Sequence, residues 1–398
     1  MVSRPPAGEA GETLIGFYGF ARITGYLILF TYIRENIISR EISRIFWLIL
    51  AVFSFESIVG IAQYLSQNSL GLGLLGEEFL RPGLKGVAEF VSHGIANPLL
   101  YSIFPHLRPI SDLTINIRAY GTLPHPNVLA GLLFFGLMAN IFVLYKGKNR
   151  ISREILAVFS LITITTGLVV TFSRLAWVIS FLGILLFAFI VVGLRAKEQF
   201  LMKTGKLDHN TRLYRPERAS FIVFILLISA AINLLAFGPQ IKDRLVGVDL
   251  AGIEANDYSA SESIDNRQVF NGIAWEIIKN NPILGVGVRN FVVSMDEYSG
   301  GLRPLPHLHQ PVHNIYLLIA AESGIFALIV FLFLLYNIVP PVVEPAGSLR
   351  GKDPLLRYTL LIIFFGFLFW GLFDHFFWTI QEGSLAFWLV AGLLVARR

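Results

Sequence analysis

The sequence predicts an all-α fold, a polytopic transmembrane helical bundle of about nine spans with a large, partly helical segment outside the membrane. First, hydrophobic residues make up 55% of the 398 residues and charged residues only 15%, whereas a soluble domain carries about 25% charged residues. Second, the hydrophobic residues lie in long runs, and about 20 apolar residues suffice for one helix to cross a bilayer. Third, a polar segment at residues 239–313 separates two of these runs.

The nine apolar runs are of unequal length, and the first is interrupted by Arg22. The first run is too long for a secretory signal peptide, and no small-residue cleavage pattern follows it. The predicted spans cover residues 13–33, 45–65, 126–145, 154–172, 175–194, 221–237, 314–338, 358–377 and 383–396.

The composition excludes several classes of function. The chain has no cysteine, which excludes disulfides, thiol catalysis and thiolate metal sites. The net charge of +5 does not indicate nucleic-acid binding, because the Lys and Arg residues lie mainly in short connections between apolar runs.

The basic residues also predict the orientation of the chain. Short connections rich in Lys and Arg face the cytoplasm, and five basic connections alternate correctly with nine spans. This orientation places residues 66–125, residues 239–313 and the turn Ser173-Arg174 on the outer side. It also places the N-terminus outside without a preceding span, so we expect that a further segment precedes it.

Several polar side chains then lie near the outer ends of predicted spans. A polar cluster at one depth of a membrane protein is typical of a site for a charged or sugar-bearing substrate. The residues concerned are His125, Asn127, Arg174, Arg267, Arg289, His313, Asn314, Asp374 and His375.

These residues also have structural interpretations, which the sequence leaves open. Arg174 could anchor a helix end by extending its guanidinium to the membrane surface. His125 could serve only the turn before a helix that begins at Pro126. Asp374 and His375 could satisfy each other inside the bundle.

Residues 266–279 predict an amphipathic helix on the membrane surface, because apolar residues recur there at the spacing of one helical face. Arg267 would lie in its first turn, where a positive helix end reinforced by an arginine can bind a phosphate. In the alternative interpretation, nearby Glu262 and Asp265 merely compensate a cation that opposes the helix dipole.

Two further patterns in the outer segment suggest ligand sites only superficially. The glycines of residues 285–290 follow a helix and not a strand, which argues against a nucleotide-binding loop. We expect them to form a tight turn that brings the backbone against the membrane helices. His307, His309 and His313 could bind a metal in principle, but they show no helical spacing before Pro311, so we expect no metal site.

Four groups of residues, taken in this order, resemble the O-antigen ligase and polymerase superfamily. The first two groups are Pro124-His125-Pro126-Asn127 and Phe172-Ser173-Arg174. The third group contains Arg267, Trp275, Asn281-Pro282-Ile283-Leu284-Gly285-Val286-Gly287 and Asn290-Phe291. The fourth group contains His313-Asn314-Ile315-Tyr316-Leu317 and Glu322-Ser323-Gly324.

The resemblance covers about residue 121 to the C-terminus and predicts two regions. Residues 1–123 would hold the N-terminal spans and the first outer loop. Residues 124–398 would form an O-antigen-ligase-like membrane domain that includes a periplasmic segment at 239–313. Members of the superfamily usually have more than nine spans, so the chain looks short at its N-terminus.

The resemblance implies a glycosyltransferase of cell-envelope polysaccharide biosynthesis, such as that of lipopolysaccharide, in the plasma (inner) membrane. The donor would be a glycan on undecaprenyl pyrophosphate, and the acceptor a hydroxyl of a glycan, a lipid or a protein. The active site would face the periplasm or the cell exterior and need no cofactor, metal or nucleic acid.

The resemblance also implies residue roles. Arg174 and Arg267 match motif arginines expected to bind the pyrophosphate, and His313 matches the expected general base. Fixed guanidiniums stabilise a phosphate leaving group, and imidazole is a suitable base near neutral pH. We expect these three residues to lie near one another beside a lateral opening. His125, Asn127, Arg289, Asn314, Asp374 and His375 are additional candidates.

Two other functions remain open from the sequence. A solute transporter would show paired halves, discontinuous helices and charges in mid-membrane. The sequence shows no repeat, and Arg22 and Glu56 are the charges it places in mid-membrane. A non-catalytic partner in envelope assembly would use the outer polar residues only as an interface. The sequence does not separate ligase from polymerase, because both would use the same donor-binding groups.

Overall fold

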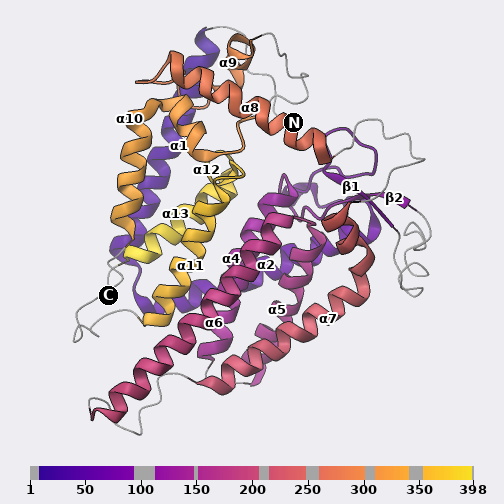
Figure 1. The fold of residues 1–398 in the computed structure, drawn as a ribbon, viewed down its shortest axis with the longest axis vertical. Helices are drawn as coiled ribbons and strands as arrows, with labels where there is room; N and C mark the ends of the chain where they lie inside the picture. The colour runs from indigo at the N-terminus through magenta and orange to yellow at the C-terminus, as the bar shows by residue number, and fades with distance from the viewer. Residues whose placement is uncertain are drawn as a thin grey trace. The chain divides into compact units, whose positions relative to one another are not determined.

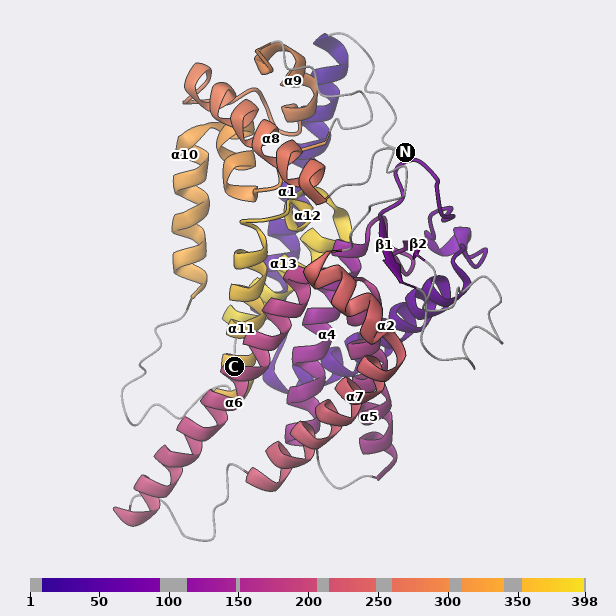
Figure 2. The ribbon, with the colours of Figure 1, turned by 45° about the vertical axis from the view of Figure 1, so that its right-hand side comes forward.

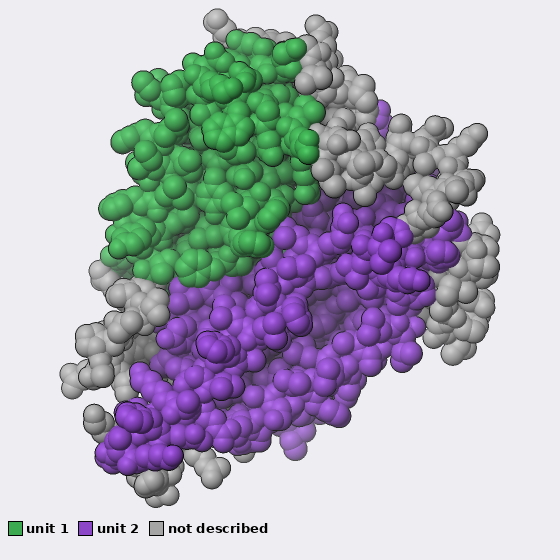
Figure 3. Space-filling model, in the orientation of Figure 1, with its two compact units in different colours: residues 1–39, 253–351, 364–398 green, residues 40–252, 352–363 purple. Residues whose placement is uncertain are grey.

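The structure is a computed structural model that describes residues 9–93, 113–147, 151–205, 215–247, 260–300, 310–339 and 353–396. Helices dominate this part of the chain, with one small sheet (Figure 1). The chain forms two compact units (Figure 3). Unit 1 comprises Met1–Ser39, Ile253–Gly351 and Phe364–Arg398, and unit 2 comprises Arg40–Gly252 and Lys352–Ile363.

Unit 2 is built around α4, which is apolar on all sides and buried along almost its whole length. A helix that is hydrophobic all round is stable only when other helices cover it. Helices α5, α6 and α7 pack against α4. The rings of Phe46 and Phe53 in α2 contact the ring of Phe135 in α4. The helices are α2 (Ser39–Ser66), α4 (Pro126–Lys146), α5 (Ile151–Val170), α6 (Arg174–Lys203) and α7 (Pro216–Val246).

A two-stranded antiparallel sheet in unit 2 was not predicted from the sequence. Strand β1 (Glu89–His93) pairs with β2 (Leu113–Ile117), with Val91 opposite Ile115. A short 3₁₀ helix, η1 (Gly73–Leu75), precedes them. The sheet packs against α7, so the outer segment predicted at 66–125 contributes to the folded unit.

Unit 1 contains α1 (Glu9–Asn36), α8 (Ala260–Asn280), α9 (Phe291–Tyr298), α10 (Ile315–Ile338), α12 (Phe376–Thr379) and α13 (Gln381–Val395). Helix α11 (Pro354–Trp370) begins in unit 2 and ends in unit 1. Helices α1 and α13 lie side by side (Figure 2). They approach closely because Gly392 has no side chain where a Cβ would meet Ile33 at 2.9 Å.

Among the described residues, seven helices are long and apolar enough to cross a membrane, and they match the first seven predicted spans. The prediction of an all-α bundle with membrane-spanning helices is therefore confirmed, but the predicted number of nine spans is not. The predicted spans 358–377 and 383–396 correspond to the shorter apolar helices α11 and α13. Helix α11 ends at Trp370, and a turn separates it from α12.

The outer segment predicted at 239–313 also differs from the structure at its start. Helix α7 continues through Pro239 to Val246, instead of ending near residue 237. Side chains of its last turns form hydrogen bonds within unit 2, from Gln240 and Arg244 to backbone carbonyls and from the backbone of His93 to Asp243, which offset the backbone hydrogen bond that a proline removes. The domain boundary predicted at residues 123 and 124 rests on the resemblance and stays a prediction.

Candidate active site

The segment that leads into α10 holds His313 in a fixed position. Asn314 caps α10, because its Oδ1 accepts hydrogen bonds from the backbone N–H of Tyr316 at 2.9 Å and of Leu317 at 3.1 Å. The next residue, Ile315, donates its backbone N–H to the carbonyl of Gly371 at 2.8 Å. Asn314 therefore has a structural role, and it ties His313 to the turn between α11 and α12.

That turn brings an acid and a second imidazole to His313. Oδ1 of Asp374 lies 3.8 Å from Nδ1 of His313, and the ring of His375 stacks on that of His313 at 5.1 Å between centroids. Nδ1 of His313 is buried and forms no hydrogen bond with any residue that the structure describes. Because the His313 side chain is still 19% exposed, one ring can face both the carboxylate and solvent.

His375 is held as a neutral imidazole. Burial lowers its pKa to about 4, an effect that the carboxylate of Asp374 opposes and His313 reinforces. Its Nδ1 lies 2.6 Å from Oγ1 of Thr379, and its backbone N–H donates to Oδ1 of Asp374 at 2.8 Å. The mutual contact predicted for Asp374 and His375 thus exists, but both residues also adjoin His313.

The same three side chains have the composition of a metal site. The ligand atoms of His313, Asp374 and His375 all lie within 4.8 Å of one another, and imidazole and carboxylate groups are common zinc ligands. The metal ligands weighed from the sequence share only His313 with this group, and the other two, His307 and His309, lie outside the described residues.

Helix α8 approaches His313 with its apolar face. The ring of Phe270 lies 6.2 Å from the ring of His313, and Phe270, Ala274 and Ile277 belong to the core that α8 forms with α9 and α10. The prediction that this face lies on the membrane surface is wrong, because protein covers it.

The prediction that Arg267 occupies the first turn of a helix is also wrong. Helix α8 begins at Ala260, so Arg267 lies in the helix interior and gains nothing from a free helix end. It is one turn before Phe270 and two before Ala274, and side chains at this spacing share a helix face. Half-buried Arg267 therefore lies on the side of α8 that faces His313.

The predicted tight turn at residues 285–290 is confirmed. Helix α10 is kinked at Gly324, where φ is +83°, and the turn packs its backbone into this kink. Val286 and Gly287 donate to the carbonyls of Ala321 and Glu322 at 3.0 and 2.9 Å. A Cβ on Gly324 would meet the carbonyl oxygen of Ile283 at 1.9 Å. The glycine turn at residues 285–290 and the kink at Gly324 therefore pack against each other, and this packing requires a glycine at position 324.

Arg289 packs against α1. Its guanidinium stacks over the ring of Tyr18 at 5.5 Å. Burial and the charge of Arg22 lower the pKa of Arg289, while Glu322 opposes the shift. Arg22 donates to the hydroxyl of Tyr26 and to the carbonyl of Thr379, so this mid-span charge is satisfied within unit 1.

In unit 2, Arg174 is the first residue of α6 and is exposed. The turn before it is unusual, because Phe172 has a φ of +47° although it is not a glycine. The Phe172 ring is fully buried and packs on the rings of Phe90 and Tyr64, at 4.2 and 5.2 Å. This packing fixes the carbonyl groups of Thr171 and Phe172.

Two arginines that sequence reasoning missed bind those carbonyl groups. Arg118 donates Nε–H to the carbonyl of Thr171 at 2.6 Å, and Arg244 donates Nε–H to that of Phe172 at 3.0 Å. Both residues lie in segments predicted to be outside, where basic residues are rare. That rarity was the signal that could have identified them.

The Pro124-His125-Pro126-Asn127 motif supports this turn and caps α4. Nδ1 of His125 accepts the backbone N–H of Asn127 at 3.1 Å, and the helix begins at Pro126, so His125 serves the turn before this helix. Oδ1 of Asn127 accepts a hydrogen bond from Arg118 at 2.8 Å. The motif therefore orients Arg118, which in turn holds the Thr171 carbonyl.

Residues 158–332 match the family model described as O-Antigen ligase. The match begins in α5, ends in α10 and contains Arg174, Arg267 and His313. The match supports the O-antigen ligase superfamily for these residues. The resemblance inferred from the motifs is confirmed, and at the level of the O-antigen ligase family it implies a membrane enzyme that transfers glycosyl groups. None of the curated proteins matches the chain.

The expectation that Arg174, Arg267 and His313 lie near one another stays a prediction. Arg267 and His313 both belong to unit 1, whereas Arg174 belongs to unit 2. What the structure brings together within unit 1 is His313, Asp374, His375 and α8, and within unit 2 it is Arg118, Arg174 and Arg244.

Proposed function

We propose that this protein transfers a glycan from undecaprenyl pyrophosphate to an acceptor hydroxyl on the outer side of the plasma membrane. The observation that carries the proposal is the half-buried His313, whose Nδ1 lies 3.8 Å from the carboxylate of Asp374, in a chain with apolar helices that matches the O-antigen ligase family model. Such a pairing is typical of a general base whose second ring nitrogen is free to accept a proton.

In the proposed reaction, Nε2 of His313 takes the proton of the acceptor hydroxyl. The hydroxyl oxygen attacks the anomeric carbon of the donor sugar, and the bond from that carbon to the pyrophosphate oxygen breaks. The configuration at that carbon inverts, and undecaprenyl pyrophosphate leaves as an anion. The proton on His313 then passes to solvent. Asp374 stabilises the imidazolium that forms between these steps.

Arg174 and Arg267 bind the pyrophosphate in this proposal, which stabilises the negative charge that grows as the bond breaks. Because the pyrophosphate already activates the sugar, the step needs no nucleotide and no metal. The neutral state of His375 fits this assignment, since a second positive charge beside His313 would disfavour its protonation.

The test uses the purified full-length protein in lipid nanodiscs with a lipid-linked glycan donor extracted from its host. We expect His313→Ala to lower turnover about 10²–10⁴-fold, the scale of general base catalysis. Gln310→Ala, in the same loop, serves as the matched control and should transfer glycan normally. Full turnover by His313→Ala would remove the catalytic role, and absence of transfer by the unmodified protein would favour a transporter or an assembly partner.

A further inference from the structure

Unit 2 contains a polar cavity of about 360 Å³, a volume within the range of small-molecule binding sites. Its walls are the last residue of α2 with the two residues that follow, the loop at Arg81 and Pro82, and residues 114–116 of β2. The sequence predicts that these segments lie outside the membrane. Neither the histidine cluster nor the turn before α6 lines the cavity, so it is distinct from both.

Gln67 holds the wall after α2 against the wall formed by β2. Its Oε1 accepts the backbone N–H of Ile117 at 2.8 Å, and its Nε2 donates to the carbonyl of Tyr64 at 2.6 Å. Gln67 makes these bonds with a φ of +50°, a left-handed conformation that is unfavourable for a residue other than glycine. Because the Gln67 side chain is buried, the two bonds fix the distance between the two walls.

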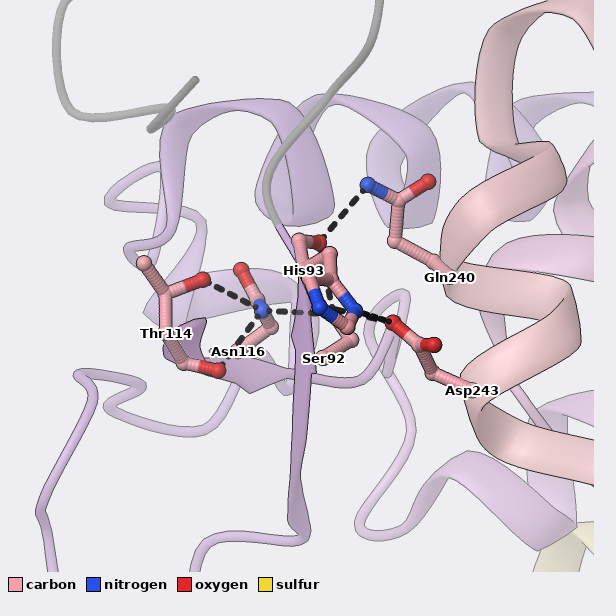
Figure 4. Close-up of polar contacts among 6 residues, drawn as sticks. All are labelled: Ser92, His93, Thr114, Asn116, Gln240 and Asp243. Atoms are coloured by element: carbon pink, nitrogen blue, oxygen red, sulfur yellow. Dashed lines mark hydrogen bonds and ion pairs between the residues drawn. The ribbon is translucent and has the colours of Figure 1, made fainter. Parts of the chain in front are cut away.

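Strand β2 is in turn anchored to α7 through β1 (Figure 4). Nδ2 of Asn116 donates to Oγ1 of Thr114 at 2.8 Å and to Oγ of Ser92 at 3.0 Å. His93, the next residue in β1, donates its backbone N–H to Oδ2 of Asp243 in α7 at 2.7 Å. The side chains of Thr114 and Asn116 are therefore preorganised, and a preorganised site loses less entropy when a ligand binds.

Several polar groups of the lining are not used by the fold. Asn116 is only 8% exposed and bonds through Nδ2, so its Oδ1 receives no hydrogen bond from a described residue. Oγ1 of Thr114 accepts from Asn116 and can still donate its own proton. Asn68 uses its Oδ1 for the N–H of Ser69 and keeps its two Nδ2 protons. The exposed guanidinium of Arg81 forms no hydrogen bond or ion pair with any residue that the structure describes.

This set of groups matches a ligand that carries several hydroxyl groups. Each hydroxyl both donates and accepts a hydrogen bond, and the lining offers unused donors and an unused buried acceptor, which is costly to leave unpaired. The lining contains one cation and no carboxylate, so it suits a neutral ligand better than a strongly charged one. Pro82 and the 41% exposed Ile115 add apolar surface for carbon-bound hydrogens.

We propose that this cavity binds one sugar unit of the glycan that the enzyme transfers or extends. Arg81 and the amide of Asn68 donate hydrogen bonds to the sugar hydroxyls, and Oδ1 of Asn116 accepts one. The choice of a sugar over another ligand rich in hydroxyl groups rests on the proposed function. The cavity and its unused polar groups do not depend on it.

The experiment measures binding of two oligosaccharides to the full-length protein in phosphatidylcholine nanodiscs by titration calorimetry. One is released by mild acid from the host's lipid-linked donor, and the other is the envelope oligosaccharide of a host strain that lacks this protein. Arg81→Ala should weaken binding about 10-fold or more and Asn68→Ala about 3–10-fold, the expected effects of a lost charged and a lost neutral hydrogen bond. The oligosaccharide that binds identifies the cavity as a donor site or as an acceptor site.

A matched control and a thermal measurement separate binding from charge and from folding. Lys85→Ala removes an exposed cation from the loop that carries Arg81, but Lys85 does not line the cavity, so this variant should bind as the unmodified protein does. The melting temperatures of Arg81→Ala and Asn68→Ala should stay near that of the unmodified protein, because both side chains are exposed.

Glycan transfer gives a second readout. The cavity binds the glycan equally in the ground state and in the transition state, so Arg81→Ala should raise KM for the glycan that binds and leave kcat unchanged. A fall in kcat with an unchanged KM would overturn the proposal, because it would place Arg81 at the reacting bond.

Three binding results would also overturn the site. The first is that neither oligosaccharide binds to the unmodified protein. The second is equal affinity of Arg81→Ala, Asn68→Ala and the unmodified protein. The third is that sodium phosphate binds and depends on Arg81 while the oligosaccharides do not bind, which would make the cavity an anion site.

The same variants distinguish failure of the cavity from failure of the proposed function. If His313→Ala abolishes transfer while Arg81→Ala keeps full affinity for both oligosaccharides, the proposed function stands and the cavity proposal fails. If Arg81→Ala loses affinity for an oligosaccharide while His313→Ala transfers glycan normally, the sugar site stands and the proposed role of His313 fails.

Discussion

The polar groups of the two units differ in kind. In unit 1, His313 and neutral His375 adjoin the carboxylate of Asp374. In unit 2, the turn before α6 is surrounded by Arg118, Arg174 and Arg244, and two of them donate to backbone carbonyl groups. Imidazole with a carboxylate suits proton transfer, whereas fixed guanidiniums suit binding of an anion. In the proposed function, unit 1 therefore carries the proton transfer together with one pyrophosphate-binding arginine, Arg267, and unit 2 carries the other, Arg174.

The two regions are also held in different ways. The histidine cluster depends on a helix cap and on a turn between short helices. The arginine turn depends on buried rings and on a strand that joins α7. Substitutions that disturb backbone packing should therefore affect stability first, while substitutions of the charged groups themselves should affect function without unfolding the protein.

After the loss expected for His313→Ala, the next largest effect should come from replacing the arginines of both units by lysines. Arg174→Lys with Arg267→Lys keeps both charges, but an ammonium cannot reproduce the planar two-point contact. We expect transfer to fall about 10²-fold or more, since two charged contacts are lost. A glycan-transfer assay with the host's lipid-linked donor measures this. Normal transfer by the double variant would leave both arginines as helix anchors.

A smaller effect is expected at the carboxylate of unit 1. Asp374→Asn keeps the size of the side chain but removes the charge that stabilises the protonated imidazole. We expect turnover to fall about 10–100-fold, the scale seen when a histidine loses an orienting partner, with unchanged affinity for pyrophosphate. If the affinity falls and the turnover does not, Asp374 acts on binding and not on proton transfer.

Stability should depend on the packing of α10 against residues 282–290. Gly324→Ala would drive a Cβ into the carbonyl of Ile283 and place alanine at a positive φ, at an expected cost of about 1–3 kcal/mol. Gly193→Ala in α6 is the control, because no atom lies within 4 Å of its Cβ position. Thermal unfolding followed by tryptophan fluorescence should show a lower melting temperature for the first variant only.

The smallest expected effect is that of a chelator. We expect EDTA dialysis to leave glycan transfer unchanged, because the proposed reaction uses His313 as a base and not as a metal ligand. Loss of activity that added zinc restores would show that His313, Asp374 and His375 bind a metal, and it would replace the general-base mechanism.

The positions of most helices could be predicted because long apolar runs are bounded by polar or basic residues. The break after Trp370 could not, since Gly371, Leu372 and Phe373 continue the apolar run through the turn. The start of α8 was placed too late because residues 260–265 are mostly polar and give no periodic apolar signal.

The candidate site was predicted only where a motif marks it. His313 and Arg174 lie in recognisable motifs, whereas Arg244 acquires its role by contact with Phe172, which is far away in the sequence. The same holds for Arg118 and Thr171. Contacts between residues far apart in the sequence form only through tertiary packing, so they cannot be predicted from local patterns in one sequence.

The central claim is that His313 performs the chemistry and the Arg174 turn binds the anion. The most direct test measures turnover at saturating donor and affinity for inorganic pyrophosphate in His313→Ala and in Arg174→Gln. We predict that His313→Ala loses turnover and keeps the affinity, and that Arg174→Gln loses the affinity. The claim is contradicted if His313→Ala keeps full turnover, or if it loses as much pyrophosphate affinity as Arg174→Gln does.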